Sequence, residues 1–360
     1  MNLDNYFRKH IKNIPFYEGV DPSIKLAEES GVLPENIIKL NANENPFGKT
    51  LDLGRNLSSI NIHEYPDPNQ KQLRESLSKY TGKNVDELVA GSGSDELIDI
   101  LIRIFLDQGD TLLDAQPTFG MYEFFAKIQG AKVISIPRDK NYNLDLPSIL
   151  SKIDKSTKMI FLASPNNPTG NLASYIEIKT LLESELIVVV DETYFEFSNK
   201  TYSGLINDYE NLVVLRSFSK WAGLAGLRIG YAISNPKLIQ RMLLVKQPYN
   251  INSAAEHVAI LAMSKKQELL NKVEILIQQK DIIYEFLKNK KGLKAYPSTA
   301  NFILCDFKNN DSNDIFNQLA QNGIFVRKFS NRFINNCLRI SAGTPDQTGK
   351  LLQVLDNIIS

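Results

Sequence analysis

The chain contains little cysteine and no excess of either charge. Its 360 residues include two cysteines, Cys305 and Cys337, which are too few for a disulfide framework and lack the spacing of a metal site. We interpret both as reduced core residues. Lysine plus arginine and aspartate plus glutamate each number 41, which gives a formal net charge of zero. This balance favours neither a nucleic acid nor an anionic membrane as the partner, and it leaves a small molecule.

Long apolar runs are also absent from the sequence. No segment approaches the roughly 18 apolar residues of a membrane-spanning helix, and residues 1–10 lack the apolar core of a signal peptide. These absences predict a soluble, cytoplasmic protein. With 43% hydrophobic residues, the chain can still bury a large core, and it is long enough for two domains.

Segments with helical and strand periodicity alternate from about residue 69 onward. A helix is predicted over residues 70–80, and another begins after the glycine-containing loop at residues 91–96. The predicted strands cover residues 88–90, 111–115, 132–136, 159–163, 186–190, 212–216 and 228–233. Such alternation predicts an α/β fold, in which a mainly parallel sheet is covered by helices on both faces.

The pattern changes near residue 250. Residues 254–288 have helical periodicity with one break, and three short strands then alternate with two helices. The predicted strands are residues 302–305, 324–326 and 337–340, and the predicted helices are residues 313–321 and 348–359. We therefore expect a smaller α+β domain at residues 251–360, a large ligand-binding domain at 41–250, and an N-terminal arm with a small-domain segment at 1–40. The cleft between the two domains is the expected active site.

One lysine stands in a run of small and hydroxyl-bearing residues. Lys220 lies between Ser217 and Ser219 on one side and Arg228 on the other, and Asp191 ends the apolar strand before them. Ligands of open α/β sheets bind at such carboxyl ends of strands. These residue types suit pyridoxal phosphate, because a lysine binds its aldehyde, a carboxylate pairs with its ring nitrogen, and hydroxyls with an arginine hold its phosphate. Considered singly, Lys220 is more readily explained as a surface lysine and Asp191 as a cap at the end of a strand. Because all five residue types that the cofactor needs occur in the right order, we favour the cofactor site.

The glycine-containing loop suggests two uses. Gly91 and Gly93 follow a strand and precede a helix, as in a dinucleotide site, but Glu96 occupies the place of the third glycine. A dehydrogenase is therefore disfavoured. The alternative is that Gly93, Ser94 and Asp95 present backbone amides at a helix N-terminus to the cofactor phosphate.

A stiff turn at residues 164–170 carries two adjacent asparagines. Such side chains can simply bond to their own backbone, but beside a pyridoxal phosphate site Asn167 and the phenol of Tyr194 could both face the ring phenolate oxygen. Phe119 follows a strand and is placed to stack on the ring, although an aromatic residue in this position is more often part of the core.

Together these motifs resemble the class II aminotransferases of fold type I, and most closely the histidinol-phosphate aminotransferases. The resemblance spans nearly the whole chain. The matching segments are residues 41–46 (Asn-Ala-Asn-Glu-Asn-Pro), 63–67 (His-Glu-Tyr-Pro-Asp), 93–96, 164–170, 191–194, 217–228 and 338–340. This implies the fold of type I pyridoxal phosphate-dependent transferases.

The resemblance also implies residue roles. Lys220 would bind pyridoxal 5′-phosphate covalently and then act as general acid and base, while Asp191 pairs with the ring nitrogen. Tyr194 and Asn167 would face the phenolate oxygen. Tyr65 is similar to the residue that reaches the cofactor phosphate of a neighbouring subunit, which implies a homodimer with shared active sites.

A further set of residues is implied for the substrate. Arg339 resembles the arginine that binds a substrate carboxylate in the wider superfamily and, with Arg327, the phosphate in histidinol-phosphate enzymes; both anions suit a guanidinium. Asn43, Asn167 and Tyr17 complete the expected substrate site. Two departures affect it, because the chain reads Pro-Phe-Tyr at residues 15–17 where the family has Pro-Tyr, and it lacks the family's Tyr-Gly pair between the two arginines.

Four functions remain open at this point. The leading hypothesis is amino transfer between histidinol phosphate and 2-oxoglutarate, in histidine biosynthesis. The second keeps the chemistry but changes the substrate to an aromatic amino acid or a small phosphorylated ketone such as dihydroxyacetone phosphate. The third is a pyridoxal phosphate-dependent decarboxylase on the same fold. The fourth is a non-catalytic regulator, which is disfavoured because the chain has no spare length for a DNA-binding module.

Overall fold

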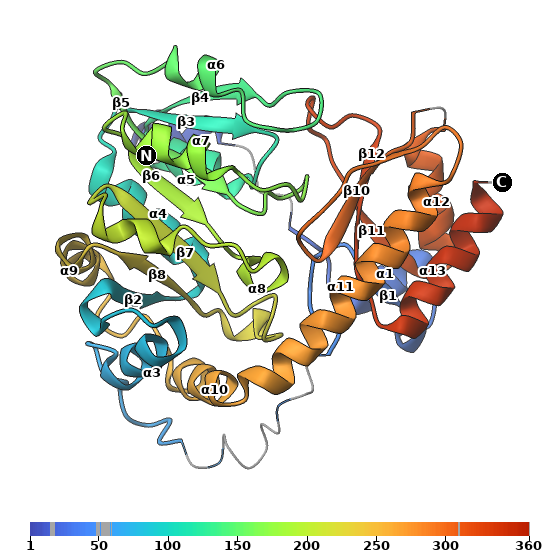
Figure 1. Cartoon of the computed structure of the whole chain (residues 1–360), viewed down its shortest axis with the longest axis horizontal. Coiled ribbons are helices and arrows are strands. Elements are labelled where there is room, and N and C mark those ends of the chain that lie inside the picture. The colour runs from blue at the N-terminus through green and yellow to red at the C-terminus, as the bar shows by residue number, and fades with distance from the viewer. Residues whose placement is uncertain (15–18, 48–50, 52–57, 59, 309, 360) are drawn as a thin grey trace.

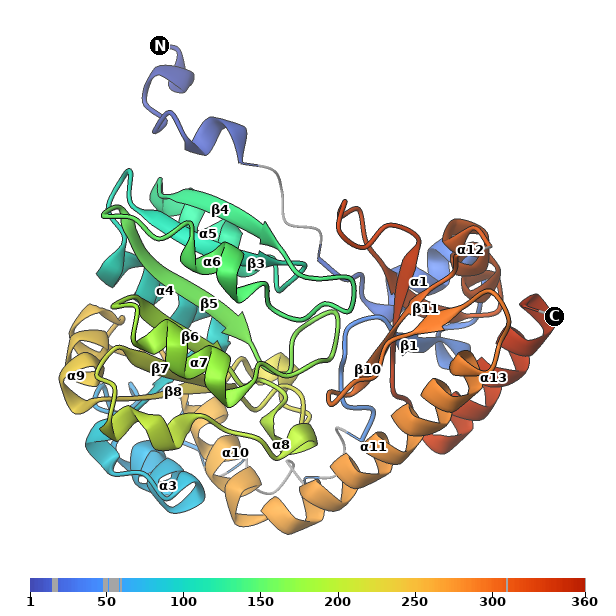
Figure 2. The same ribbon diagram turned by 45° about the horizontal axis from the view of Figure 1, so that its top comes forward.

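The computed structural model describes residues 1–14, 19–47, 51, 58, 60–308 and 310–359. Two sheets with their helices lie side by side, and the long helix α11 (Lys266–Lys288) runs from one to the other (Figure 1). The N-terminal residues extend past the large sheet (Figure 2). They are held there by Arg8 and His10, which contact the backbone carbonyls of Gln129 and Ile128. No helix in the described ranges is long and apolar enough to cross a membrane.

Among the described residues, seven strands form the large sheet in the order β2-β8-β7-β6-β5-β3-β4. They are β2 (Leu88–Gly91), β3 (Thr111–Gln116), β4 (Lys132–Pro137), β5 (Thr157–Ala163), β6 (Ile187–Asp191), β7 (Leu212–Ser217) and β8 (Gly230–Ser234). Strands β3 to β7 pair in parallel, whereas β8 is antiparallel to both β2 and β7. The predicted mainly parallel α/β sheet is confirmed.

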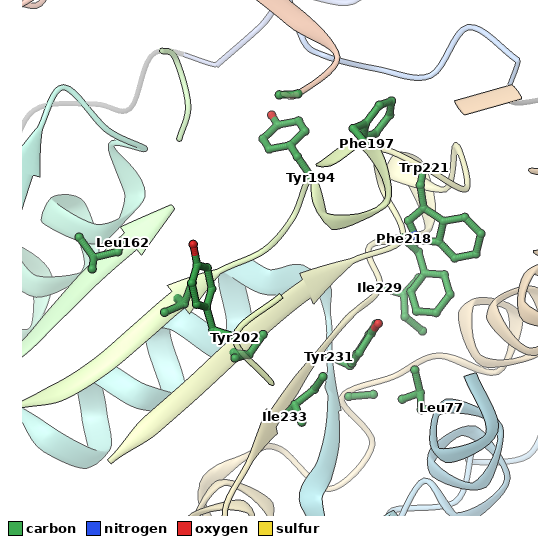
Figure 3. Close-up of a cluster of buried hydrophobic side chains, with 14 of the residues drawn as sticks. Leu77, Leu162, Tyr194, Phe197, Tyr202, Phe218, Trp221, Ile229, Tyr231 and Ile233 are labelled. Carbon is green, nitrogen blue, oxygen red and sulfur yellow. The ribbon is translucent and has the colours of Figure 1, made fainter. Parts of the chain in front are cut away.

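Strand β6 shows that the centre of this sheet is buried on both faces. Val188 and Val190 belong to one hydrophobic cluster and Val189 to another, because successive side chains of a strand point to opposite faces. Both faces are covered by helices, so the strands read as continuous apolar runs. The first face carries α3 (Lys71–Thr81), α6 (Leu146–Leu150), α7 (Tyr175–Leu182), α8 (Phe195–Ser198) and α10 (Ser253–Ser264); the second carries α4 (Gly93–Phe105), α5 (Met121–Gln129) and α9 (Pro236–Val245). Figure 3 shows part of the first cluster, with Tyr231 and Trp221 inside it.

The small sheet combines both ends of the chain. Its described strands lie in the order β1-β11-β12-β10-β9. They are β1 (Ile38–Leu40), β9 (Lys294–Ala295), β10 (Phe302–Asp306), β11 (Ile324–Lys328) and β12 (Cys337–Ser341), with helices α1 (Ser23–Ser30), α12 (Ser312–Gln321) and α13 (Pro345–Ile358). β1 pairs in parallel with β11, so an N-terminal segment completes a sheet of C-terminal strands. Short 3-10 helices cover Leu3–Asn5, Ile11–Asn13, Pro34–Asn36, Val85–Glu87, Ser203–Asn207 and Ala225–Leu227.

Helix α11 is shared by the two halves of the molecule. Val273 and Leu276 pack in the cluster of the large sheet, together with α10, whereas Ile283 and Leu287 pack against the small sheet. The described connection is thus a continuous helix and not a flexible linker. The domain limits expected from the sequence, at residues 40/41 and 250/251, stay a prediction.

We expect Gly170→Ala to destabilise the protein strongly. Gly170 has φ +79°, and a Cβ atom there would lie 2.2 Å from Ser298 Oγ of the segment leading to β10. Gly109→Ala is a matched control, because Gly109 also has positive φ (+99°) but nothing within 4 Å of the added atom. The control should lose about 1–2 kcal/mol of unfolding free energy through backbone strain, and Gly170→Ala about 1–3 kcal/mol more through overpacking. Urea denaturation measures both, and equal losses would contradict the clash.

Candidate functional site

A cavity of about 370 Å³ lies between the two sheets, at the carboxyl ends of β5, β6 and β7. Open α/β sheets bind their ligands at such an edge. The large-domain side of the cavity carries Asp191 and Lys220, and the small-sheet side carries Arg327 and Arg339. The residues predicted from the sequence that line it are Asn43, Ser94, Asp95, Phe119, Asn167, Asp191, Tyr194, Ser217, Ser219, Lys220, Arg228, Arg327 and Arg339.

Two of the predicted site residues that the structure describes do not line this cavity. Gly93 lies directly behind it, next to the guanidinium of Arg228. Tyr65 is 81% exposed and stacks on Tyr249, so its expected contact with a neighbouring subunit's site stays a prediction. Tyr17 lies outside the described residues.

Lys220 enters the cavity from a segment anchored in the core. Phe218 and Trp221 are fully buried on either side of it (Figure 3). Its Nζ atom donates a hydrogen bond to the carbonyl oxygen of Ala42 at 3.0 Å. Burial, reinforced by the positive charges of Arg339 and Arg228, lowers the pKa of Lys220 to about 8. A substantial fraction of the amine is therefore neutral, and nucleophilic, near physiological pH.

Asp191 ends strand β6 with its carboxylate held from two sides. Tyr122 donates its phenol hydrogen to Oδ2 at 2.8 Å, and the backbone amide of Thr193 donates to Oδ1 at 3.0 Å. Burial raises the pKa of Asp191, although these hydrogen bonds oppose the rise. Tyr122 was not predicted as a site residue. The sequence feature that could have indicated it is its position three residues after Phe119, since the two rings pack edge-on with their centres 5.5 Å apart.

The N-terminus of helix α4 forms one end of the cavity. Ser94 and Asp95 line it, and the hydroxyl of Ser217 donates to that of Ser219 at 3.0 Å nearby. Asp95 forms an ion pair with Arg228 at 2.9 Å. Gly93 has φ +76°, which favours glycine, and a Cβ atom on it would lie 2.5 Å from Arg228 Nη2, so a larger residue would strain the backbone and displace the guanidinium. Hydroxyls, an arginine and a helix N-terminus together make an anion site.

The two asparagines of the turn after β5 have different surroundings. Asn166 is buried and bonds to Thr118 and Thr169, so it holds the turn. Asn167 lines the cavity and accepts a hydrogen bond from Arg339 Nη1 at 2.6 Å, which connects the large sheet to the small one.

Asn43 holds the phenol of Tyr194 in the cavity wall. Its Nδ2 donates to Tyr194 Oη at 2.8 Å, while its own Oδ1 accepts from the Ser341 hydroxyl at 2.8 Å. Asn301 Nδ2 donates to the carbonyl of Asn43 at 3.1 Å. Asn43, expected at the substrate, thus contacts a residue expected at the cofactor.

Two arginines face each other at the other end of the cavity. Arg327 and Arg339 are directly paired across β11 and β12. Their guanidinium carbons lie 6.0 and 5.7 Å from the ring centre of Phe329, which belongs to the stretch between the two arginines that lacks the family's Tyr-Gly pair. Like charges on opposed strand positions repel, so an anion bound beside both would relieve the repulsion. Asn331 also lines the cavity and donates to Gln116 Oε1 at 3.2 Å.

This set of groups fits pyridoxal phosphate. The cavity offers a lysine with a lowered pKa and a buried carboxylate. It also offers an anion site, where Gly93 leaves space for the guanidinium of Arg228. No cluster of three or more metal-binding side chains occurs in the part of the chain that the structure describes. The site can therefore bind an aldehyde cofactor at one end and an anionic substrate group at the other.

Known proteins were compared with the whole chain. The family model for aminotransferases of class I and II matches residues 35–355. A histidinol-phosphate aminotransferase of Dehalococcoides mccartyi is 39% identical, with 98% of each chain covered. A chloroplastic one of Arabidopsis thaliana is 37% identical over 98% of this chain and 85% of its own. The crystal structure of histidinol-phosphate aminotransferase from Sinorhizobium meliloti, in complex with pyridoxal-5′-phosphate, matches with a TM-score of 0.87 at 23% identity, over 98% of this chain and 97% of that one.

The lowered pKa of Lys220 can be measured by chemical modification. Reductive methylation of the ligand-free protein at a series of pH values, read by peptide mass spectrometry, should give a midpoint for Lys220 near 8, against about 10.4 for a free lysine. Arg339→Gln should raise this midpoint, because it removes a positive charge that disfavours the protonated amine. A midpoint near that of free lysine in the unsubstituted protein would contradict the burial of this amine.

Proposed function

Because the chain belongs to the family of class I and II aminotransferases, we propose that it transfers an amino group between histidinol phosphate and 2-oxoglutarate, with pyridoxal 5′-phosphate as the cofactor. The sequence likeness supports the substrate, since relatives covering 98% of the chain at 37–39% identity are named histidinol-phosphate aminotransferases. Two small molecules, an amino donor and an oxo acceptor, are the partners of such a reaction.

One observation supports the phosphorylated substrate above the others. A single cavity carries Lys220 at one end and the cross-strand pair Arg327 and Arg339 at the other. A carboxylate needs one guanidinium, whereas a phosphate dianion can engage two. The paired arginines therefore favour a substrate with an amino group at one end and a phosphate at the other.

The residues that would hold the cofactor follow from the site. Lys220 Nζ would bind the aldehyde, and Asp191, steadied by Tyr122 and Thr193, would accept a hydrogen bond from the ring nitrogen. Ser217, Ser219, Arg228 and the amides at the start of helix α4 would hold the phosphate group. When bound, pyridoxal phosphate withdraws electrons from the carbon that carries the substrate amine.

Lys220 then has a second task as general base. With cofactor and substrate bound, Nζ would accept the proton of the amino-bearing carbon and return it. A pKa near 8 suits both directions of this transfer. At neutral pH the neutral amine is available to accept a proton, and the ammonium form is available to donate one. Tyr194, held by Asn43, and Asn167 would orient the cofactor ring from the opposite side of the cavity.

We also propose that the protein is a cytoplasmic homodimer with shared sites. The exposed residues Tyr65, Tyr249 and Ile62 support a subunit contact near the segment that resembles the family's Tyr-Pro-Asp motif. Two buried, unpaired thiols support a reducing compartment.

The reaction type is tested with glutamate as the amino donor. We expect the yellow purified protein to convert glutamate to 2-oxoglutarate and to retain the amino group on its cofactor. The ketone that corresponds to histidinol phosphate should then take up this amino group. Lys220→Ala should abolish both half-reactions. Release of carbon dioxide without amino transfer would favour a decarboxylase, and faster turnover of phenylalanine or dihydroxyacetone phosphate would replace histidinol phosphate as the substrate.

The arginine pair predicts how the phosphate contributes to turnover. Arg327→Gln and Arg339→Gln should each lower kcat/KM for histidinol phosphate by roughly 10- to 100-fold, since a hydrogen bond to a charged group is worth about 1.5–3 kcal/mol. Turnover of histidinol, which lacks the phosphate, should change little in Arg327→Gln. Arg332→Gln is the control, because Arg332 is exposed and does not line the cavity. If Arg327→Gln lowered kcat/KM equally for histidinol phosphate and histidinol, Arg327 would not bind the phosphate.

A further inference from the structure

A buried ion pair lies behind the cavity and takes no part in lining it. Glu192 is 0% exposed and Arg216 is 4% exposed. The guanidinium contacts Glu192 Oε2 through Nε at 3.0 Å and through Nη2 at 2.9 Å. Each residue stands directly beside a predicted cofactor residue in the chain, since Glu192 follows Asp191 and Arg216 precedes Ser217.

The pair organises the whole segment after strand β6. Glu192 Oε1 accepts a hydrogen bond from the backbone amide of Tyr202 at 2.6 Å. Arg216 Nη2 donates to Thr201 Oγ1 at 2.8 Å, and its guanidinium carbon lies 3.6 Å from the ring centre of Phe195. Residues 192–202 are thus fixed at both ends and at Phe195, which directly follows Tyr194.

The alternation of side chains places the pair opposite the cofactor groups. Val214 of β7 belongs to the first cluster and Leu215 to the second, so Arg216 and Ser217 point to opposite faces of the sheet. Asp191 accepts a hydrogen bond from Tyr122 of the second cluster, so it points to the same face as Ser217. The backbone amide of Glu192 donates to the carbonyl of Leu215 at 2.8 Å, which connects the two strand ends directly.

Such a pair is a poor source of stability. Removing two charged groups from water costs about as much as their attraction returns, and well-packed neutral side chains are often at least as stable. A buried ion pair is better suited to fixing one geometry among several. Here it would fix the spacing between the strand ends that carry Asp191 and Ser217.

A second carboxyl group lies next to this pair. Glu196 accepts a hydrogen bond from the phenol of Tyr80 at 2.9 Å. Burial raises the pKa of Glu196 to about 7, and the charge of Arg216 opposes the rise. Glu196 thus shares the field of Arg216 without the direct contact that Glu192 makes.

We propose that Glu192 and Arg216 are positioning residues that hold Asp191, Tyr194 and Ser217 at the spacing that pyridoxal phosphate requires. The inference rests on the proposed function, since it concerns the same cofactor site. Neither residue touches the cavity, so each would act through its neighbours in the chain.

The test replaces the pair without leaving an unpaired charge. In the double variant Glu192→Gln and Arg216→Met, the glutamine can still accept from the amide of Tyr202 and the methionine fills the space of the arginine stem. We expect the thermal midpoint of the full chain to change by only a few degrees. The dissociation constant of pyridoxal phosphate, measured by fluorescence titration, should rise about tenfold or more, and the pH midpoint of the bound cofactor's visible absorbance should shift.

Matched variants separate positioning from general damage. Glu210→Gln with Lys237→Met makes comparable changes in an exposed pair near the other end of β7, and it should leave the dissociation constant and the pH midpoint unchanged. Arg216→Lys keeps the charge but cannot reproduce the forked contacts, so its dissociation constant should lie between those of the unsubstituted protein and the double variant. If the double variant does not fold, Arg216→Lys, which keeps both charges of the pair, serves for the comparison.

The outcomes distinguish this inference from the proposed function. If the unsubstituted protein does not bind pyridoxal phosphate, the proposed function fails. If it binds, and the folded double variant, or Arg216→Lys in its place, binds equally well with an unchanged pH midpoint, the positioning role is overturned while the function stands. A weaker affinity and a shifted midpoint at an unchanged thermal midpoint support the positioning role.

Discussion

Three consecutive residues after strand β1 connect the two halves of the active site. The carbonyl of Asn41 accepts from Arg339, the carbonyl of Ala42 accepts from Lys220, and the side chain of Asn43 donates to Tyr194. β1 itself is paired with β11 of the small sheet. The positions of Lys220, Tyr194 and Arg339 therefore depend on one short segment, which follows β1 and lies far in sequence from all three residues.

This arrangement makes the site sensitive to the relation between the sheets. Lys220 follows strand β7 of the large sheet and Arg339 lies in β12 of the small one, yet both bond to neighbouring carbonyls. A second connection runs from Arg339 to Asn167. Any shift of the small sheet would change the distance between Arg339 and Lys220, and with it the pKa of the Lys220 amine. The charge state of the lysine is thus physically coupled to the position of the arginine.

Much of the fold could be predicted from the sequence, because the central strands are short, almost wholly apolar segments whose pattern is visible locally. Strand β1 was missed, since its three residues Ile38–Leu40 become a strand only by pairing with β11, far away in the chain. Most of the residues predicted for the cofactor were marked by their types and order and line one cavity, although Gly93 and Tyr65 do not. Ala42 was missed as a site residue because a backbone carbonyl has no side-chain signature, and Tyr122 because its partner Asp191 is distant in sequence.

Burial shifts the pKa values of Lys220 and Asp191 in opposite directions. It lowers the pKa of Lys220 and raises that of Asp191, so in each case it disfavours the charged form. For the lysine this is useful at once, because the neutral amine is the nucleophile. For the aspartate, two hydrogen bonds restore only part of the lost hydration. A protonated ring nitrogen beside Asp191 would supply the missing positive partner, so the same desolvation that prepares the lysine also makes the carboxylate a strong site for a cationic heterocycle.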